Sequence, residues 1–174
     1  MSGVNTIVVS IRLKSKTSER LKKLADEERV TLSALIGHIL DSYLEWETFA
    51  PKIGMLPMHK ETIKLLLAPL SDDQLKQVAH TSAIKFMDAI VLITGELTLD
   101  GFLDLTKIRL SRSGIAFNHI IEDGKMRFII NHHMGRKWSV FFCAVCSTIV
   151  QKLGYLPKAG VRDDMWVMTI ELKH

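Results

Sequence analysis

The chain has 174 residues, of which 47% are hydrophobic and 24% are charged, and its formal net charge is +4. This balance is that of a folded globular chain, and it excludes an intrinsically disordered or fibrous one. No apolar run approaches the roughly 20 residues that a membrane-spanning helix requires, and two cysteines are too few for a disulfide scaffold. We therefore expect a cytoplasmic protein with no membrane partner.

The excess positive charge is concentrated at one end of the chain. Residues 1–24 contain six basic side chains against a single carboxylate, that of Glu19. The basic residues there are Arg12, Lys14, Lys16, Arg20, Lys22 and Lys23. A basic N-terminal region is compatible with nucleic-acid binding, although charge alone does not establish it.

In chain order, the first predicted element is a strand over residues 6–14. Its sequence, TIVVSIRLK, is rich in β-branched residues and alternates between two faces. One face carries four apolar side chains, those of Ile7, Val9, Ile11 and Leu13. The opposite face carries Val8, Ser10 and Arg12.

Two helices are predicted to follow this strand. Leu21, Leu24 and Ala25 recur at helical spacing in the first of them. Thr31 is a suitable N-cap for the second, which is expected over residues 32–47 with an apolar stripe along one side. One strand and two helices cannot bury their own apolar faces. We therefore expect two copies to pair their strands antiparallel, over a core made by the helices of both.

Residues 6–47 resemble the ribbon–helix–helix family of DNA-binding regulators, the MetJ/Arc/CopG type. The resemblance lies in an alternating strand that ends Ile11-Arg12-Leu13, eight residues to Leu21, nine more to Val30, and then Thr-x-Ser-x-Leu-Ile opening the second helix. It implies an intertwined β-α-α dimer whose two-stranded β-ribbon reads the major groove of DNA. The turn between the helices often carries glycine in this family, and that position is Arg29 here.

The resemblance also implies which side chains read bases. They are the outward residues of the strand, Val8, Ser10 and Arg12. Arg12 can donate in bidentate fashion to guanine, Ser10 can donate or accept a hydrogen bond, and Val8 can touch a thymine methyl group.

Phosphate contacts are expected at two further places. In the family, the N-terminus of the second helix points at a backbone phosphate, and the residues here are Thr31, Leu32 and Ser33. Lys14 and Lys16 are expected to add phosphate contacts that fix the register without reading sequence.

A linker at residues 49–58, with two prolines and a glycine, is predicted to separate a DNA-binding domain over 1–48 from an α+β domain over 59–174. We expect this second domain to sense a signal, to oligomerise or to contact a partner. Helical patterns cover residues 59–70, 72–93, 99–110 and 136–153, and strand patterns cover 115–121, 125–132 and 166–172. The sequence Glu122-Asp123-Gly124 is a strong hairpin signal between the first two strands. The expected fold is thus a β-hairpin, a long helix and a final strand after the first helices.

Two groups of residues in this domain are candidate sites. His132, His133, Cys143 and Cys146 offer ligands for zinc, nickel or copper. The cysteines lie within VFFCAVCSTIV, however, an apolar helix in which cysteine usually acts as a small buried hydrophobe, so packing is favoured and no cofactor is expected.

The second group is Arg136 and Lys137, at the predicted N-terminus of the long helix. Two cations beside free helical N–H groups form a candidate anion or ligand site. The simpler interpretation is a solvated helix cap with Trp138 anchored in the core.

No phosphate-binding loop, nucleophile elbow, zinc-protease or dinucleotide-binding pattern occurs, so an enzyme is not expected. The leading hypothesis is a homodimeric transcriptional regulator, a repressor or an activator, that binds double-stranded DNA. Higher oligomers and the effector stay open. One alternative is an antitoxin-type regulator whose C-terminal part binds a protein. The other is a repressor that senses a metal or another ligand.

Overall fold

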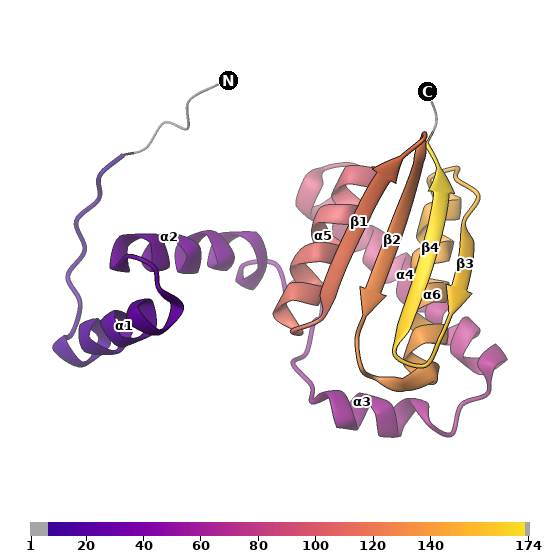
Figure 1. Cartoon of the computed structure of the whole chain (residues 1–174), viewed down its shortest axis with the longest axis horizontal. Coiled ribbons are helices and arrows are strands. Elements are labelled where there is room, and N and C mark those ends of the chain that lie inside the picture. Colours follow the sequence, from indigo (N-terminus) through magenta and orange to yellow (C-terminus); the bar gives the residue numbers. More distant parts are fainter. Residues whose placement is uncertain (1–6, 173–174) are drawn as a thin grey trace. The chain divides into compact units, whose positions relative to one another are not determined.

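A computed structural model describes residues 7–172 of the chain. The chain divides after Thr48 into two compact units, and each unit is described on its own (Figure 1). This boundary falls where the predicted linker begins, at the start of the sequence FAPKIGMLP.

The N-terminal unit consists of an extended segment and helices. Residues 7–14 have no regular secondary structure. They lead into α1 (Ser15–Glu28), which is followed by α2 (Leu32–Ser42) and by η1 (Tyr43–Glu47), a single π-helical stretch that continues α2.

The predicted strand over residues 6–14 is therefore wrong for this chain, and so is the β-α-α order expected of a ribbon–helix–helix fold. The described N-terminal unit opens with helices, and Thr6 lies outside the described residues. The physical reason is that a strand is held by hydrogen bonds to a neighbouring strand. The side chains of residues 7–14 alternate in the sequence, but all of them are exposed, and the other elements of the unit are helices, which offer the segment no strand to pair with.

The turn between α1 and α2 has the backbone conformation that favours glycine. Arg29 ends α1 with φ = 57°, in the left-handed region. The N–H of Val30 donates to the carbonyl of Ala25 at 3.0 Å, and that of Arg29 donates to the carbonyl of Asp26 at 3.2 Å. These bonds satisfy carbonyls that the helix end would otherwise leave free. Thr31 then caps α2, since its Oγ1 accepts from the N–H of Ala34 at 3.1 Å.

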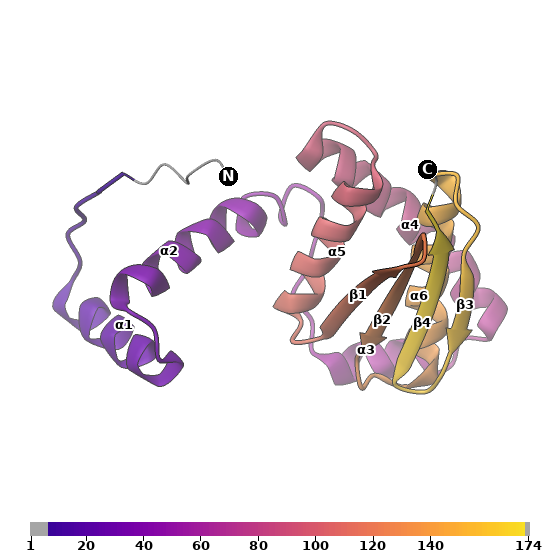
Figure 2. The same ribbon diagram turned by 45° about the horizontal axis from the view of Figure 1, so that its top comes forward.

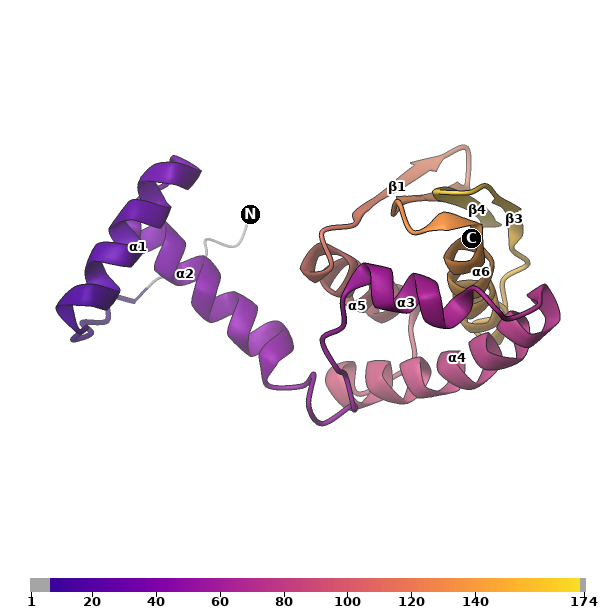
Figure 3. The ribbon, with the colours of Figure 1, turned by 90° about the horizontal axis from the view of Figure 1, so that it is seen from below.

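The C-terminal unit has three layers. A four-stranded sheet forms the first layer, α5 (Leu99–Arg112) and α6 (Gly135–Lys152) pack on one of its faces, and α4 (Asp72–Thr94) packs on these two helices from the far side. Figure 3 shows α4 as the helix farthest from the strands, with α3 (Lys60–Leu67) crossing one end of the unit. No helix within residues 7–172 combines the length and the apolar character needed to cross a membrane.

The sheet is antiparallel throughout, and its strand order is β1-β2-β4-β3 (Figure 2). β1 (Ala116–Glu122) and β2 (Lys125–Asn131) form the predicted hairpin. Its turn residues Asp123 and Gly124 have φ values of 50° and 69°, as a tight hairpin turn requires. β4 (Met165–Glu171) pairs with β2 close to the predicted range, whereas β3 (Lys158–Val161) was not predicted.

The core lies between the sheet and the helices. Every second residue of β2 and of β4 is buried there: Met126, Phe128, Ile130, Trp166, Met168 and Ile170. A chain of aromatic rings links the three layers, because the ring of Phe102 on α5 lies 6.4 Å from that of Phe86 on α4 and 6.2 Å from that of Phe128 on β2. This packing fixes α5 and α6 relative to the sheet and so places the side chains discussed below.

We expect Arg29→Gly to raise the free energy of unfolding by about 0.5–1 kcal/mol. Relief of the left-handed strain on a residue with a Cβ outweighs the added flexibility of the unfolded chain. Urea denaturation of the full chain, followed by circular dichroism, measures the change. Arg20→Gly is the matched control, because the same replacement in the exposed middle of α1 should lower stability by about 1 kcal/mol. A loss of stability in Arg29→Gly would contradict the assigned role of the turn.

Candidate nucleic-acid interface

The extended segment 7–14 exposes every one of its side chains. The three predicted base readers lie on it, and Val8 is the most open of them, at 99% exposed. Arg12 and Ser10 are exposed too, with Lys14 at the end of the segment and Lys16 in the first turn of α1. Among the ion pairs formed by the described residues, none uses Arg12, Lys14 or Lys16. These cations are therefore available to an external anion.

The same segment also exposes large apolar side chains to water, which is unfavourable. Ile7 is 86% exposed and Val9 is 70% exposed. Exposed apolar residues continue along the unit: Ile11, Leu13, Leu24, Ile39, Leu40, Tyr43 and Leu44. Only Ala25 and Leu35 are buried within residues 7–48. Exposed apolar surface of this kind is typical of sites at which proteins bind another molecule.

The N-terminus of α2 is a second place that suits an anion. Thr31 engages the N–H of Ala34, and the N–H groups of Leu32 and Ser33 stand in the first turn, where a helix has no carbonyls to offer. No acidic side chain occupies the first turn of α2. The positive end of the helix dipole is therefore not neutralised by a carboxylate of its own helix.

Within one chain, these two places are not brought together. Lys14 precedes α1 and Thr31 follows its end, and the 14 residues of α1 span about 21 Å. The residues predicted to contact DNA all lie in one unit, where Leu32 is half-buried and the others are exposed, and the predicted base readers and the N-terminus of α2 lie at opposite ends of α1.

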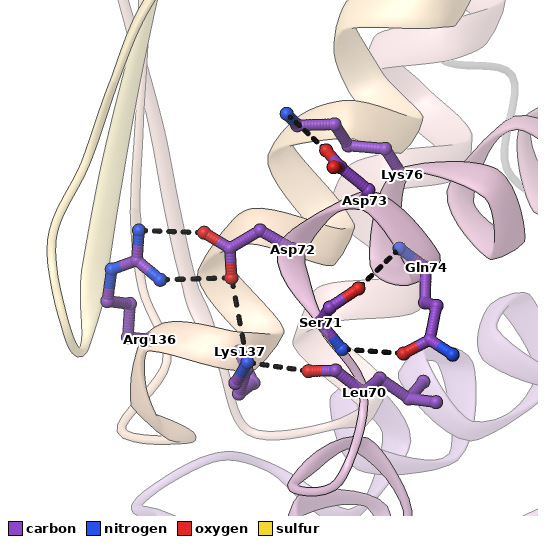
Figure 4. A network of polar contacts seen from close by, with 8 residues as sticks. All are labelled: Leu70, Ser71, Asp72, Asp73, Gln74, Lys76, Arg136 and Lys137. Carbon is purple, nitrogen blue, oxygen red and sulfur yellow. Dashed lines mark hydrogen bonds and ion pairs between the residues drawn. The ribbon is translucent and has the colours of Figure 1, made fainter.

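In the C-terminal unit, Arg136 and Lys137 both lie against the carboxylate of Asp72. Arg136 Nη2 lies 3.0 Å from Asp72 Oδ2, and its Nη1 donates to Asp72 Oδ1 at 3.2 Å (Figure 4). Lys137 Nζ donates to the carbonyl of Leu70 at 2.6 Å and lies 3.6 Å from Asp72 Oδ1. The hydrogen bond from Arg136 lowers the pKa of Asp72, and the same bond raises the pKa of Arg136. The predicted anion site is therefore filled by a carboxylate of the chain itself, which joins the starts of α4 and α6.

His132 is buried with both ring nitrogens engaged. The N–H of Met134 donates to Nδ1 at 3.0 Å, so Nε2 carries the proton and donates to Ser139 Oγ at 2.7 Å. Ser139 in turn donates to the carbonyl of Asp163 at 3.2 Å. Burial lowers the pKa of His132 to about 4, which keeps the ring neutral. His132 thus has no lone pair free for a metal, while His133 is exposed and has φ = 55°.

The two cysteines lie on the buried face of α6 and are not joined in a disulfide. Burial raises the pKa of Cys143 and raises that of Cys146 further, so both are thiols rather than thiolates. Among the residues that the structure describes, no group of three or more histidine, cysteine or acidic side chains is placed to hold a metal ion. The four residues considered as metal ligands therefore do not converge on one point.

Arg109 on α5 was not predicted from the sequence to be a site residue. Its guanidinium carbon lies 5.3 Å from the ring centre of Phe86 and 5.7 Å from that of Phe142. The sequence did contain a sign of it. Phe102 begins an apolar stripe on the buried side of α5, and the polar side chains of Thr106 and Arg109 interrupt this stripe. Polar side chains on the apolar side of a helix usually interact with other groups inside the protein, because burying them without a partner is costly.

Comparisons with known proteins give no family for this chain. No model of a known protein family matches it. No curated protein is detectably similar to it in sequence. Its function must therefore be argued from its own residues.

The buried imidazole of His132 predicts how stability depends on pH. Its folded pKa of about 4 lies below the ordinary 6.5, so the unfolded chain binds a proton between these values and the folded chain does not. The stability due to His132 is complete above pH 6.5 and is lost as the pH falls toward 4, with a slope of at most about 1.4 kcal/mol per pH unit. Urea unfolding between pH 7 and pH 4.5 measures it.

His132→Asn should flatten this slope, because asparagine can still accept from the N–H of Met134 but does not titrate. His133→Asn removes a neighbouring exposed imidazole and should keep the slope, since asparagine tolerates the left-handed backbone there. Equal slopes in the parent and in His132→Asn would rule out His132 as the source.

Proposed function

We propose that this protein is a homodimeric, sequence-specific regulator of transcription that acts in the cytoplasm on double-stranded DNA. The N-terminal unit contacts DNA, and the C-terminal unit senses a signal or holds the assembly together. The observation that carries the proposal is segment 7–14, which exposes unpaired cations beside apolar residues that the unit itself cannot cover.

The exposed apolar residues support a dimer. A unit whose only buried side chains within residues 7–48 are Ala25 and Leu35 has too small a core to be stable alone. A second copy would cover the exposed leucines, isoleucines and valines of both units, and each such side chain contributes about 1.5–3 kcal/mol when it is fully buried. The dimer is expected to be symmetric, because the same surface is available on each copy.

The polar side chains of the same segment suit duplex DNA. Arg12 can donate two hydrogen bonds to the edge of a guanine, while Ser10 and Val8 can meet a neighbouring base. Lys14 and Lys16 supply phosphate contacts, and the first turn of α2 supplies N–H groups to another phosphate. A twofold dimer presents each of these groups twice, so the site on DNA is expected to be a pseudo-palindrome.

A toxin-neutralising role, the alternative from the sequence, has less in its favour. The regions that neutralise toxins are usually short tails that order on binding. Here the C-terminal unit has its own three-layered core, so it is not a short tail that orders on binding.

Selection of binding sites from random or genomic DNA by the purified protein tests the proposal. On the selected site, Arg12→Ala should cost about 1–3 kcal/mol and relax the preference for one base. Lys14→Ala is the matched control, since it also removes one cation. It should weaken specific and random DNA alike and reduce the slope of log affinity against log salt by about 1. Failure to enrich any site, or unchanged specificity in Arg12→Ala, would contradict the proposal.

The dimer has a test of its own. Leu44 is 62% exposed in the single chain, so Leu44→Glu should not disturb the fold of the monomer. We expect it to shift the protein from dimer to monomer in analytical ultracentrifugation and to weaken DNA binding with it. Leu156→Glu is the control, because Leu156 is 85% exposed and belongs to the other unit. A monomeric parent, or a Leu44→Glu protein that dimerises normally, would exclude this interface.

A further inference from the structure

Strand β1 forms one edge of the sheet, and no strand within residues 7–172 pairs with its outer side (Figure 2). Six of its seven residues are exposed, and Phe117 is half-buried. Ile120 is 48% exposed and Ile121 is 58% exposed, although successive side chains of a strand point to opposite faces. This edge therefore presents both unpaired backbone groups and apolar side chains to water.

The other edge of the sheet, β3, is protected in ways that β1 is not. β3 has four residues and carries Lys158 and Gly160. Short edge strands and lysine side chains are common means by which proteins prevent an edge from pairing with another chain. β1 contains no lysine and no proline, and its one carboxylate, that of Glu122, stands at its end. The edge of β1 is thus suited to pair with a further strand.

The register of the hairpin determines which backbone groups of β1 point outward. Glu122 and Lys125 flank the two-residue turn, and the pair at this place in a hairpin is hydrogen-bonded. Hydrogen-bonded and non-hydrogen-bonded pairs alternate along an antiparallel ladder, so every second residue back from Glu122 also bonds to β2. The residues between them direct their N–H and C=O groups toward the open edge. These residues are Phe117, His119 and Ile121.

We propose that β1 pairs antiparallel with β1 of a second copy of this chain, so that the two sheets become one continuous sheet. His119 is the middle residue of β1. A twofold axis beside it places His119 of one copy opposite His119 of the other, and Phe117 of each copy opposite Ile121 of the other. In this register all three outward residues of each edge gain backbone partners.

The side chains of β1 fit the same register. The rings of Phe117 and His119 stack 6.0 Å apart on one face of the strand, and Phe117 lies opposite the exposed Ile121 of the other copy. Aromatic and β-branched side chains are a favourable cross-strand pair. Glu122 lies opposite Ala116, so no two carboxylates oppose each other. A second copy thus covers apolar side chains of both edges without bringing like charges together.

This pairing gives the C-terminal unit its part in holding the assembly together, and it rests on the proposed dimer for its strength. Seven residues from each copy are far fewer than the roughly 20–30 a side of a standard interface. The pairing is therefore weak between free chains. It forms once the N-terminal units hold two chains together, because tethering raises the effective concentration of one edge near the other. Leu44→Glu is accordingly still expected to give monomers.

Disulfide formation between full-length chains tests this register. His119→Cys places two thiols opposite each other, with Cα atoms about 5.5 Å apart, which a disulfide can span. Ile121→Cys is the matched control, because it is exposed on the same edge but its Cα atoms in the two copies lie at least about 14 Å apart. The chain's own cysteines are buried and do not compete. Mild oxidation and a denaturing gel without reductant measure the covalent dimer.

His119→Cys should form the covalent dimer at least about tenfold faster than Ile121→Cys. Adding Ile121→Pro to His119→Cys should remove this advantage. The N–H at position 121 points to the second copy and not to β2, so proline there costs the hairpin no hydrogen bond. Ile121→Thr keeps that N–H, and in its place should preserve the fast reaction.

Sedimentation of the reduced His119→Cys protein separates this proposal from the proposed dimer. If the protein is a dimer but cross-links no faster than Ile121→Cys, the pairing of β1 is overturned and the N-terminal dimer stands. If the protein is a monomer, the N-terminal dimer is contradicted; fast cross-linking then still supports the pairing, and slow cross-linking overturns both.

A second pair of positions decides the question if His119→Cys does not fold. Asn118 of one copy faces Ile120 of the other in the proposed register, and neither faces itself. Both are exposed. Equilibrated mixtures of Asn118→Cys and Ile120→Cys chains should form mixed disulfides, and their absence would overturn the pairing.

Discussion

Helix α6 is the element on which the C-terminal unit depends, because it is packed on two sides. One side lies on α4 and the other on β3 and β4, so the helix separates the sheet from the outer layer. Ile149 and Val150, near its end, are fully buried. At its start, Trp138 lies between the ring of His132, 4.3 Å away, and that of Phe142, 4.7 Å away. Ser139, which binds the ring of His132, and Phe142, whose ring lies beside Arg109, are therefore parts of the same packed helix.

The two units differ in how far they bury their own apolar side chains. The C-terminal unit closes its own core, with β2 and β4 alternating between buried and accessible positions. The N-terminal unit does not, because two helices and an extended segment offer too little apolar surface to one another. In the proposed dimer, the second copy covers exposed apolar residues of both units, and some of these residues lie on segment 7–14 beside the cations proposed to contact DNA.

Local sequence signals were sufficient to predict most helices and strands of the C-terminal unit. The capping box of Ser71 and Gln74 begins α4, and Asp123-Gly124 closes the hairpin. Both depend on residues a few positions apart. β3 escaped prediction because its four residues are all exposed and include Gly160, so they carry no periodic burial. The strand expected over residues 6–14 failed for another reason, since alternation describes two faces and supplies no partner.

The candidate sites were harder to predict, because their decisive contacts join distant parts of the chain. Arg136 and Lys137 were recognised as cations at a helix start. The carboxylate that occupies them, Asp72, is 64 positions away from Arg136, and no local pattern announces it. Arg109 was missed because its neighbours Phe86 and Phe142 come from two other helices.

The contact between Asp72 and Arg136 also bears on the order of folding. It closes a loop of 64 residues, and exposed ion pairs are too weak to hold such a loop together before the core forms. The pair therefore forms late, after α4 and α6 have met through their apolar faces. An interaction absent from the transition state acts on the rate of unfolding and leaves the rate of folding nearly unchanged. The ion pair between Asp72 and Arg136 is thus expected to slow unfolding, and so to lengthen the lifetime of the folded unit, without speeding its folding.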